Sequence, residues 1–364
     1  KILFFISSLG AGGAERVAST LCNAWAARND SVTLVPTFSG GGKSFYALDE
    51  RVELISLSSL VRGHAEFGKR YVARLLALRR LIRERKPDVV VSFLPNVNIA
   101  ALAATAFTGV PCIVCERNDP SNRPLGLIWR MACRSLYRFA DLVAVQTKAV
   151  ASSIHKVYGG LRRVAVVPNP LPQDLLQISS CDSPSNQRYT LLSLGRLSEE
   201  KQVGQIIESF ATLAVKFPLW DLHIYGEGPV RDELSARIEA LGLQQRILLK
   251  GRTSEPWKVM SRADAFVMNS RYEGFPNALL EAMGVGLPCV SSDCSSGPSE
   301  ISANGQYALL FAPGDQVGLA AALVQVMADE GLRARLGRQA RESVIERYSL
   351  SAVLRIWDEF FSTV

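Results

Sequence analysis

KILFFISSLGAGGAE, residues 1–15, joins an apolar run to a glycine-rich loop and then to the beginning of a helical pattern. The run lacks a cleavage site of small residues, so we interpret it as a first β-strand and not as a signal peptide. A strand that runs through glycines into a helix resembles a dinucleotide fingerprint, although the glycine spacing does not match. No acidic residue ends the second strand, which argues against a dinucleotide site.

Short apolar, β-branched runs alternate with helical patterns along the rest of the chain, which predicts parallel sheets with helices on both faces. The strands expected in the first half are residues 1–7, 31–38, 52–57, 88–94, 111–116, 141–146 and 163–167. Those expected in the second half are residues 189–195, 220–225, 246–250, 264–269, 288–292 and 307–311. The predicted class is therefore α/β, with two doubly wound, Rossmann-like domains.

A polar, serine-rich stretch without apolar periodicity separates the two halves. We predict one domain over residues 1–170, a linker over 171–187 and a second domain over 188–348. The last segment, 349–364, has an amphipathic helical pattern and is expected to pack back on the first domain. Two such domains facing each other leave a cleft at the carboxyl ends of their strands, where ligands of these folds bind.

Composition favours an ordered chain in a reducing compartment. Of the 364 residues, 48% are apolar and 21% charged, which suits two globular domains and argues against disorder. The seven cysteines are an odd number without disulfide spacing, which indicates reduced thiols in a cytoplasm. Two residues separate Cys112 from Cys115, but their apolar surroundings favour core packing over zinc binding. The longest uncharged stretch, 89–115, is broken by prolines and polar residues, so we predict no membrane span.

Charge is concentrated in the first half. Residues 1–170 hold 23 Lys and Arg against 11 Asp and Glu, a balance of +12, and the remainder holds 18 against 23, a balance of −5. An anionic partner is implied, which the charge alone leaves open as lipid, nucleic acid or a phosphorylated substrate. No recognition-helix or zinc-finger pattern is present, which argues against nucleic acid.

The segment 67–86 combines apolar residues at helical spacing with a cluster of cations that includes Lys69, Arg70 and Arg74. Basic amphipathic helices of this kind bind anionic membrane surfaces. An ordinary core-facing helix with a solvated basic face explains the pattern equally well.

Two segments of the second half carry the chemistry. Arg271–Glu281 places Glu273 in a loop ahead of a helix with Pro276 in its first turn, so amide groups at Asn277 and Ala278 are expected to face a diphosphate. Glu281 lies further along that helix and is expected to hold a ribose hydroxyl, although taken alone it reads as a surface acid. Gly195 ends a strand and lets the backbone turn sharply out of the sheet. Arg196 and Lys201 are then expected to project over the crevice, where they would neutralise charge on a leaving diphosphate.

Other chemistries find little support. The three histidines are isolated and no Asp-x-Asp pair occurs, so we predict no metal and no other cofactor. No Gly-x-Ser-x-Gly elbow is present either. The glycines Gly12 and Gly13 are expected to let an acceptor or donor phosphate approach the backbone of the first domain.

Taken together, these residues resemble the GT4 family of retaining glycosyltransferases, over nearly the whole chain. The matching pieces are Gly12-Gly13-Ala14-Glu15-Arg16, Val167-Pro168-Asn169-Pro170, Gly195-Arg196-Leu197 with Lys201, Tyr225-Gly226-Glu227-Gly228-Pro229, and Glu273-x7-Glu281. The run Cys115-Glu116-Arg117-Asn118-Asp119-Pro120 is similar to bacterial enzymes that build lipid-linked oligosaccharides, lipopolysaccharide cores and exopolysaccharides, including N-acetylgalactosamine transferases. The resemblance implies the GT-B fold, with an acceptor-binding first domain and a nucleotide-sugar-binding second domain.

By position, the resemblance assigns the diphosphate to Arg196 and Lys201, the sugar to Glu273 and the ribose to Glu281. The rest of its donor site falls on Gly195, on Gly251 and Arg252 near the base, and on Gly274, Phe275, Pro276, Asn277 and Ala278, whose backbone would hold the sugar and phosphates. The acceptor side falls on Glu116, Arg117 and Asn118, where Arg117 replaces a histidine common in the family. Glu116 and Arg117 join Arg196, Lys201 and Glu273 as candidate catalytic residues.

The resemblance also implies an α-linked product made from a UDP-α-sugar with retention of configuration. N-acetylgalactosamine, another N-acetylhexosamine or galactose is the expected sugar, and a polyprenyl-diphosphate-linked or lipopolysaccharide glycan is the expected acceptor. The expected location is cytoplasmic and peripheral, on the inner face of the plasma membrane. Two alternatives remain: a nucleotide-sugar epimerase of the same fold, and a non-catalytic membrane-binding relative.

Overall fold

The computed structural model describes residues 1–10, 12–37, 44–57, 67–122, 125–178 and 188–364, with the side chains of 67–70 left undescribed. The chain divides into two compact units, which are Lys1–Pro170 with Val353–Val364, and Leu171–Ala352. Most of the predicted linker, 179–187, lies outside the described residues. Its first part needs correction, because Leu171 and Leu175 are fully buried in the core of the second unit.

The first unit is built on a parallel sheet with the strand order β3-β2-β1-β4-β5-β6-β7. Its strands are β1 (Ile2–Ile6), β2 (Val32–Pro36), β3 (Glu53–Leu54), β4 (Val89–Phe93), β5 (Cys112–Cys115), β6 (Leu142–Val145) and β7 (Val164–Val166). Ile2 pairs with both Val32 and Val89, so β1 lies between its neighbour in sequence and a strand reached by a crossover. This arrangement creates a switch point between β1 and β4, where ligands of doubly wound sheets bind.

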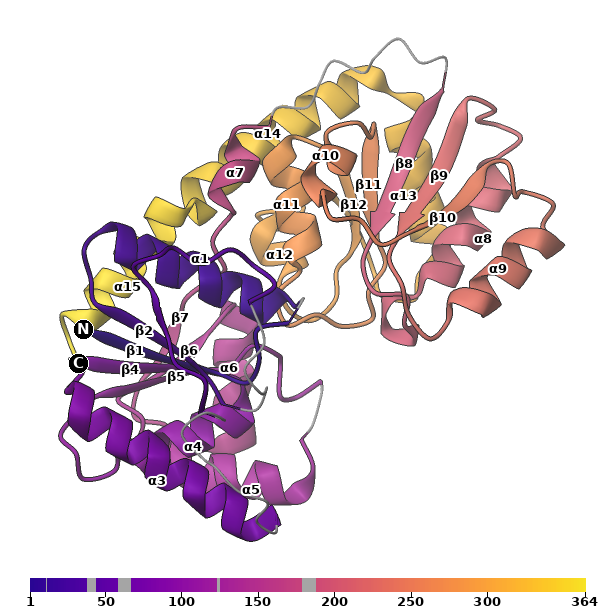
Figure 1. The fold of residues 1–364 in the computed structure, drawn as a ribbon. Coiled ribbons are helices and arrows are strands. Elements are labelled where there is room, and N and C mark those ends of the chain that lie inside the picture. Colours follow the sequence, from indigo (N-terminus) through magenta and orange to yellow (C-terminus); the bar gives the residue numbers. More distant parts are fainter. Residues whose placement is uncertain (11, 38–43, 58–66, 123–124, 179–187) are drawn as a thin grey trace. The chain divides into compact units, whose positions relative to one another are not determined.

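Helices cover both faces of this sheet, as Figure 1 shows. They are α1 (Gly13–Ala27), α3 (Phe67–Arg85), α4 (Pro95–Thr105), α5 (Leu127–Leu136), the 3₁₀ helix η1 (Tyr137–Phe139), α6 (Lys148–Tyr158) and α15 (Leu350–Phe361). Side chains alternate along β1, so Leu3 and Phe5 face the core under α3, α4, α5 and α6. Phe4 points to the other face and contacts Trp25 of α1, with 6.2 Å between the ring centroids.

The second unit repeats the plan with the strand order β10-β9-β8-β11-β12-β13, again with parallel neighbours. Its strands are β8 (Tyr189–Leu194), β9 (Trp220–Tyr225), β10 (Ile247–Gly251), β11 (Ala265–Met268), β12 (Cys289–Ser292) and β13 (Leu309–Phe311). The switch point of this sheet lies between β8 and β11. The prediction of an α/β chain with two doubly wound sheets is confirmed.

Two apolar cores sandwich the second sheet. Its helices are α7 (Gln173–Leu176), the 3₁₀ helix η2 (Glu199–Lys201), α8 (Val203–Leu213), α9 (Arg231–Ala240), α10 (Pro256–Met260), α11 (Asn277–Val285), α12 (Pro298–Ile301), α13 (Gln316–Ala328) and α14 (Glu330–Tyr348). Leu191 packs with α8, α9 and α13, whereas its neighbour Leu192 packs with α7, α10, α11 and α14. Burial on both faces explains why the strand sequences are continuously apolar.

The cysteines of the described residues pack in the cores. Cys22, Cys112, Cys115, Cys133, Cys289 and Cys294 are all buried and without a disulfide, and Cys181 lies outside the described residues. Burial raises the pKa of the Cys112 and Cys115 thiols to about 12, so both are neutral at physiological pH. Their expected role in core packing agrees with this. Among the described helices, none combines the length and apolar composition that crossing a bilayer requires.

The C-terminal helix α15 packs on α1 through aromatic side chains. Trp357 is 1% exposed and meets Trp25 edge to face, with 5.5 Å between the ring centroids. At the rim of this contact, the Arg28 guanidinium lies 2.9 Å from the Asp358 carboxylate. The last residues of the chain therefore complete the core of the first unit.

We expect Trp357→Ala to destabilise the first unit by about 3–5 kcal/mol, because it removes a fully buried aromatic side chain and leaves a cavity. Urea unfolding followed by circular dichroism measures this. Phe107→Ala is the control, since Phe107 is fully exposed and its loss should change stability by less than about 0.5 kcal/mol. Equal effects of the two variants would contradict the role of Trp357.

Candidate functional site

The predicted donor residues lie at the switch point of the second sheet. The turn after β8 carries Gly195, Arg196 and Lys201, and the loop after β11 carries Glu273. Because β8 and β11 are neighbouring parallel strands, both segments leave the sheet at the same edge. Residues that are more than 70 positions apart in sequence are thus adjacent in space.

A close backbone contact shapes the turn after β8. A Cβ atom on Gly226 would lie 1.8 Å from the Gly195 carbonyl oxygen, and one on Gly228 would lie 2.0 Å from the Leu197 carbonyl oxygen. The Gly195 amide donates to the Tyr225 carbonyl, and the Leu197 amide donates to the Glu227 carbonyl, each at 3.0 Å. Only glycine permits this approach, and Arg196, which lies within the turn, is exposed.

Lys201 and Glu273 form an ion pair, with 2.5 Å between Nζ and Oε1. The same carboxylate oxygen accepts a hydrogen bond from the Ser270 hydroxyl at 2.7 Å. The backbone also joins the two segments, since the Arg271 amide donates to the Glu200 carbonyl at 2.8 Å. Lys201 and Glu273 were expected to contact different groups of the donor. Their ion pair shows that each side chain also orients the other.

The start of α11 differs from the expectation in two details. Pro276 precedes the helix as its N-cap and is not in the first turn. The Asn277 amide donates to the Phe275 carbonyl at 2.9 Å, so it does not point outward as predicted. The Ala278 amide is in the first turn, where an α-helix offers no internal acceptor. At the other end Gly286 caps the helix with φ +97°, and Gly284 lies inside the helix.

The segment after β12 contacts the Glu273 loop, and it was not among the predicted site residues. The Ser296 hydroxyl donates to the Glu273 carbonyl. A Cβ atom on Gly297 would lie 2.2 Å from Cδ of Pro276, and the φ of Gly297 is +105°. The proximity of a Ser-Gly-Pro turn to the neighbouring strand end was the available signal.

Glu281 is buried and not a surface acid. Its side chain is 3% exposed and accepts a hydrogen bond from Nε1 of Trp257 at 3.0 Å. Trp257 belongs to α10 and was not among the predicted site residues. A carboxylate held by an indole N–H has a defined orientation, which suits recognition of a hydroxyl pair.

Gly251 and Arg252, expected near the base, end β10 beside the same turn. Gly251 has a φ of +74°, and its carbonyl accepts the Gly226 amide at 2.8 Å. Arg252 is exposed. A pocket of about 370 Å³ opens next to them and is lined in part by His223, Tyr225 and Thr253.

In the first unit, Glu116 lies at the end of β5 inside a buried polar cluster. Its side chain is 2% exposed, and its Oε1 accepts the Tyr137 hydroxyl at 2.6 Å. Asn98 donates to the Tyr137 oxygen at 2.9 Å and accepts the Ser92 hydroxyl at 2.8 Å. Burial raises the pKa of Glu116 to about 7, against the effect of hydrogen bonds from Tyr137 and Tyr158.

Arg117 is held against the protein on both sides. Its guanidinium lies 4.2 Å from the Phe93 ring centroid and donates to Oδ1 of Asn169, which also accepts from Gln146 at 2.9 Å. Burial lowers the pKa of Arg117 to about 10. Its Nε has no hydrogen-bond partner among the described residues. Asn169 is part of the Val167-Pro168-Asn169-Pro170 motif, but the sequence did not predict its hydrogen bond with Arg117.

The remaining predicted residues are placed as follows. Asn118 is partly buried beside Arg117. Gly12 caps α1, and the carboxylate of Glu15 folds back so that a Cβ atom on Gly12 would lie 2.1 Å from Glu15 Oε2. The position expected for a phosphate thus holds the chain's own carboxylate, which also accepts the Ser8 hydroxyl at 2.9 Å. The side chains of Lys69 and Arg70 lie outside the described residues, and Arg74 is partly buried.

Metal ligands do not gather in the described ranges, where no three His, Cys, Asp or Glu side chains come together. The charged groups at the donor-site edge include Arg196, Lys201 and Glu273, with Glu200 and Arg271 in the same two segments.

Comparison with known families agrees with this geometry. The family described as "Glycosyltransferase Family 4" matches residues 11–175, and the family described as "Glycosyl transferases group 1" matches residues 182–343. The chain is a GT4-type glycosyltransferase. The two matches meet between residues 175 and 182, close to the boundary after residue 170 that separates the two compact units.

Several relatives and solved structures match this chain over nearly its full length. A Campylobacter jejuni enzyme named as an alpha-1,4-N-acetyl-D-galactosaminyltransferase acting on an undecaprenol-linked glycan is 29% identical over 100% of this chain and 99% of its own. A lipopolysaccharide core biosynthesis glycosyltransferase of Rhizobium meliloti is 26% identical over 94% and 93%. HepE of Anabaena, crystallised with UDP, superposes with a TM-score of 0.82 at 18% identity and full coverage of both chains. That likeness shows the GT-B fold.

We expect the stability of this glycosyltransferase to fall as the pH rises from about 4.5 to about 7, because the raised pKa lets folded Glu116 hold a proton that the unfolded chain releases. Glu116→Gln keeps an acceptor for Tyr137 and should flatten this part of the pH profile. Urea unfolding midpoints across the range measure it, with exposed Glu346→Gln as the control. A wild-type profile in Glu116→Gln would assign the titration to another group.

Proposed function

We propose that this glycosyltransferase moves a sugar from a UDP-α-sugar to a polyprenyl-diphosphate-linked or lipopolysaccharide glycan, forms an α-linkage with retention of configuration and needs no metal. The observation that carries the proposal is the convergence of Arg196, Lys201 and Glu273 at the switch point of the second sheet. Two cations and the start of α11 suit a diphosphate, and a buried carboxylate at Glu281 suits a ribose.

Each donor group has a candidate partner. Arg196 is exposed and free of a described ion pair, so it is available to the diphosphate. Lys201 is already oriented by Glu273, and incoming phosphate oxygens would share its three donor hydrogens with that carboxylate. Glu273 is assigned to the sugar, and the backbone of Gly274 to Ala278 to the sugar and the phosphates. Glu281 is assigned to the ribose, and Gly251 with Arg252 to the base.

The reaction balances without a protein nucleophile. A bond forms between the acceptor oxygen and the anomeric carbon, and the bond from that carbon to the β-phosphate oxygen breaks. The departing β-phosphate accepts the proton of the acceptor hydroxyl. Negative charge grows on the diphosphate during this step, and Arg196 and Lys201 stabilise it there, as preorganised cations do in a site shielded from water.

The first unit is assigned to the acceptor. Glu116, Arg117 and Asn118 follow β5 at the carboxyl edge of its sheet, beside the β1/β4 switch point. Arg117 provides a positive charge where many family members have histidine, which suits a phosphorylated or carboxylated acceptor group more than proton transfer. The cations Lys69, Arg70 and Arg74 are assigned to an anionic membrane surface on the cytoplasmic side, where lipid-linked acceptors are found.

The sugar and acceptor are supported by the names of relatives. The Campylobacter jejuni relative is named for N-acetylgalactosamine transfer to an undecaprenol-linked glycan, and the Rhizobium meliloti relative for lipopolysaccharide core synthesis. N-acetylgalactosamine is our first choice, ahead of other N-acetylhexosamines and galactose.

Incubation with labelled UDP-sugars and a polyprenyl-diphosphate glycan should consume both substrates and give an α-linked product, with equal rates in the presence and absence of EDTA. Nuclear magnetic resonance of the product reports the anomeric configuration. Release of UDP or of an isomeric sugar without acceptor would indicate an epimerase, and turnover of neither substrate would indicate a non-catalytic relative. Loss of activity in EDTA would contradict metal independence.

Arg196→Ala and Lys201→Ala should each lower turnover by roughly 10²-fold or more, since each removes a charge that stabilises the leaving diphosphate. Lys216→Ala, at an exposed lysine of the same unit, is the matched control and should keep wild-type turnover. Calorimetry with UDP separates binding from catalysis. Near wild-type turnover in either site variant would remove that side chain from the mechanism.

A further inference from the structure

The helix α5 exposes apolar side chains that a globular surface ordinarily buries. Leu127 is 62% exposed, Ile128 81%, Trp129 40% and Met131 60%, all within the first turn and a half. Among the residues of α5, only Cys133 is fully buried. An apolar group of this size on one short helix is typical of a contact surface.

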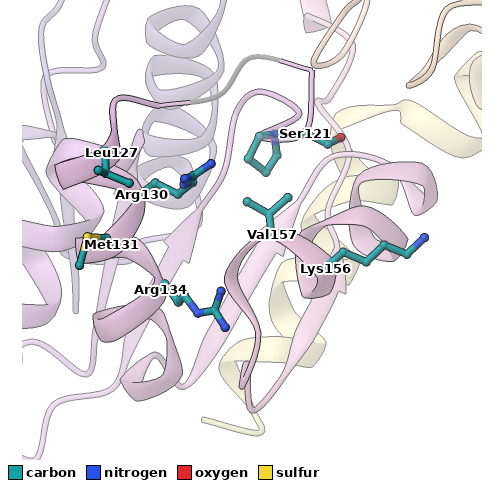
Figure 2. Close-up of a pocket in the computed structure, with 8 residues that line it drawn as sticks. Ser121, Leu127, Arg130, Met131, Arg134, Lys156 and Val157 are labelled. Carbon is teal, nitrogen blue, oxygen red and sulfur yellow. The ribbon is translucent and has the colours of Figure 1, made fainter.

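Cations accompany these apolar side chains. Leu127, Arg130, Met131 and Arg134 follow the i, i+3, i+4, i+7 spacing of one helical face and line a pocket of about 570 Å³. Lys156 and Val157 of α6 line the opposite wall. Figure 2 shows Arg130 and Arg134 projecting from α5 into the space between the two helices.

The charges of this pocket are uncompensated in the described part of the chain. Arg130, Arg134 and Lys156 line it without a carboxylate, and no described acid forms an ion pair with them. Asp119, next to the lining residue Pro120, is 5% exposed and accepts hydrogen bonds from Ser121, Asn122 and Ser153. Asp141, the acid that follows α5 in sequence, accepts a hydrogen bond from the Cys112 amide. The pocket therefore suits an anion, and its apolar wall suits a ligand with an apolar part.

A second helix of the same unit also exposes apolar side chains. The helices α3 and α5 both pack against α4 (Figure 1). On α3, Val72 is 56% and Leu76 62% exposed. Exposed apolar residues thus occur on both helices that flank α4.

We propose that α5 and its pocket form the principal bilayer contact of the protein, with Ile128 and Trp129 inserted among lipid headgroups and Arg130, Arg134 and Lys156 bound to lipid phosphates. An anionic bilayer surface combines both features, because its phosphates lie directly above an apolar layer, and tryptophan favours that boundary. This inference rests on the proposed function, since a lipid-linked acceptor requires the enzyme to work at a membrane.

The first experiment measures binding of the full chain to vesicles by co-flotation. Vesicles of phosphatidylcholine with phosphatidylglycerol should bind the wild type, and Arg130→Gln with Arg134→Gln should weaken binding roughly thirtyfold, as loss of two cations near an anionic surface implies. Arg335→Gln with Arg338→Gln removes two exposed arginines from α14 and is the matched control. Equal binding by both double variants would overturn the proposal.

The second experiment uses Trp129 as a reporter. Brominated lipids should quench part of the wild-type fluorescence, because Trp129 is exposed while Trp25, Trp220 and Trp357 are at most 2% exposed. Trp129→Phe should keep vesicle binding and lose most of this quenching, whereas Ile128→Asp should lose the binding itself. Full quenching in Trp129→Phe would place another part of the protein at the bilayer.

Two controls separate this inference from the proposed function. Calorimetry with UDP and turnover of a water-soluble acceptor should be unchanged in the Arg130 and Arg134 double variant, because these residues are outside the donor site. Analytical ultracentrifugation tests whether a second copy of the chain covers this surface instead. If the wild type is a dimer that Ile128→Asp dissociates, and vesicle binding is unchanged, the surface is a dimer interface and the proposal is overturned. If the wild type does not transfer sugar from any UDP-sugar, the proposed function is overturned, while the vesicle-binding result remains valid.

Discussion

The donor-site edge of the second unit depends on one backbone constraint, the contact of the turn after β8 with the turn after β9. Gly226 and Gly228 bring the second turn against the carbonyls of Gly195 and Leu197, at distances that exclude any side chain. Reciprocal amide-to-carbonyl bonds close the contact. The two turns pack backbone to backbone, and Arg196 in the first of them is exposed. A glycine-rich motif that is distant in sequence thus shapes the turn that carries Arg196, a residue proposed to bind phosphate.

Carboxylates that are buried or partly buried organise both units. In the second unit Glu273 orients Lys201, and Glu281 is oriented by Trp257. In the first unit Glu116 lies among hydroxyl and amide groups, where desolvation favours its neutral form. A carboxylate that is paired or hydrogen-bonded beneath the surface has few alternative rotamers, so the groups that it holds are preorganised for a ligand. This is a common way in which transferases acquire charge stabilisation without reorganisation during the reaction.

Sequence reasoning succeeded where a signal was local. The expected strands occur, because apolar runs bounded by turn residues leave few other options for burial. It failed at Pro276, which precedes the helix and packs closely against Gly297, a residue of a distant segment. It also failed at 171–178, where buried leucines pack with residues of α11 and α14. The alternative of a surface position for Glu281 also failed, since helical periodicity cannot reveal the α10 tryptophan that covers it.

By itself, the sequence determined the α/β class, the parallel order implied by alternating elements, and the residue types suited to a nucleotide diphosphate. Those features follow from local spacing and from the chemistry of single side chains. Only the tertiary structure decided that Lys201 pairs with Glu273, that Asn169 holds Arg117, and that α5 leaves its apolar side chains exposed. Each of these depends on which distant segments become neighbours, and that depends on sheet order and on the packing of whole helices, which no short stretch of sequence encodes.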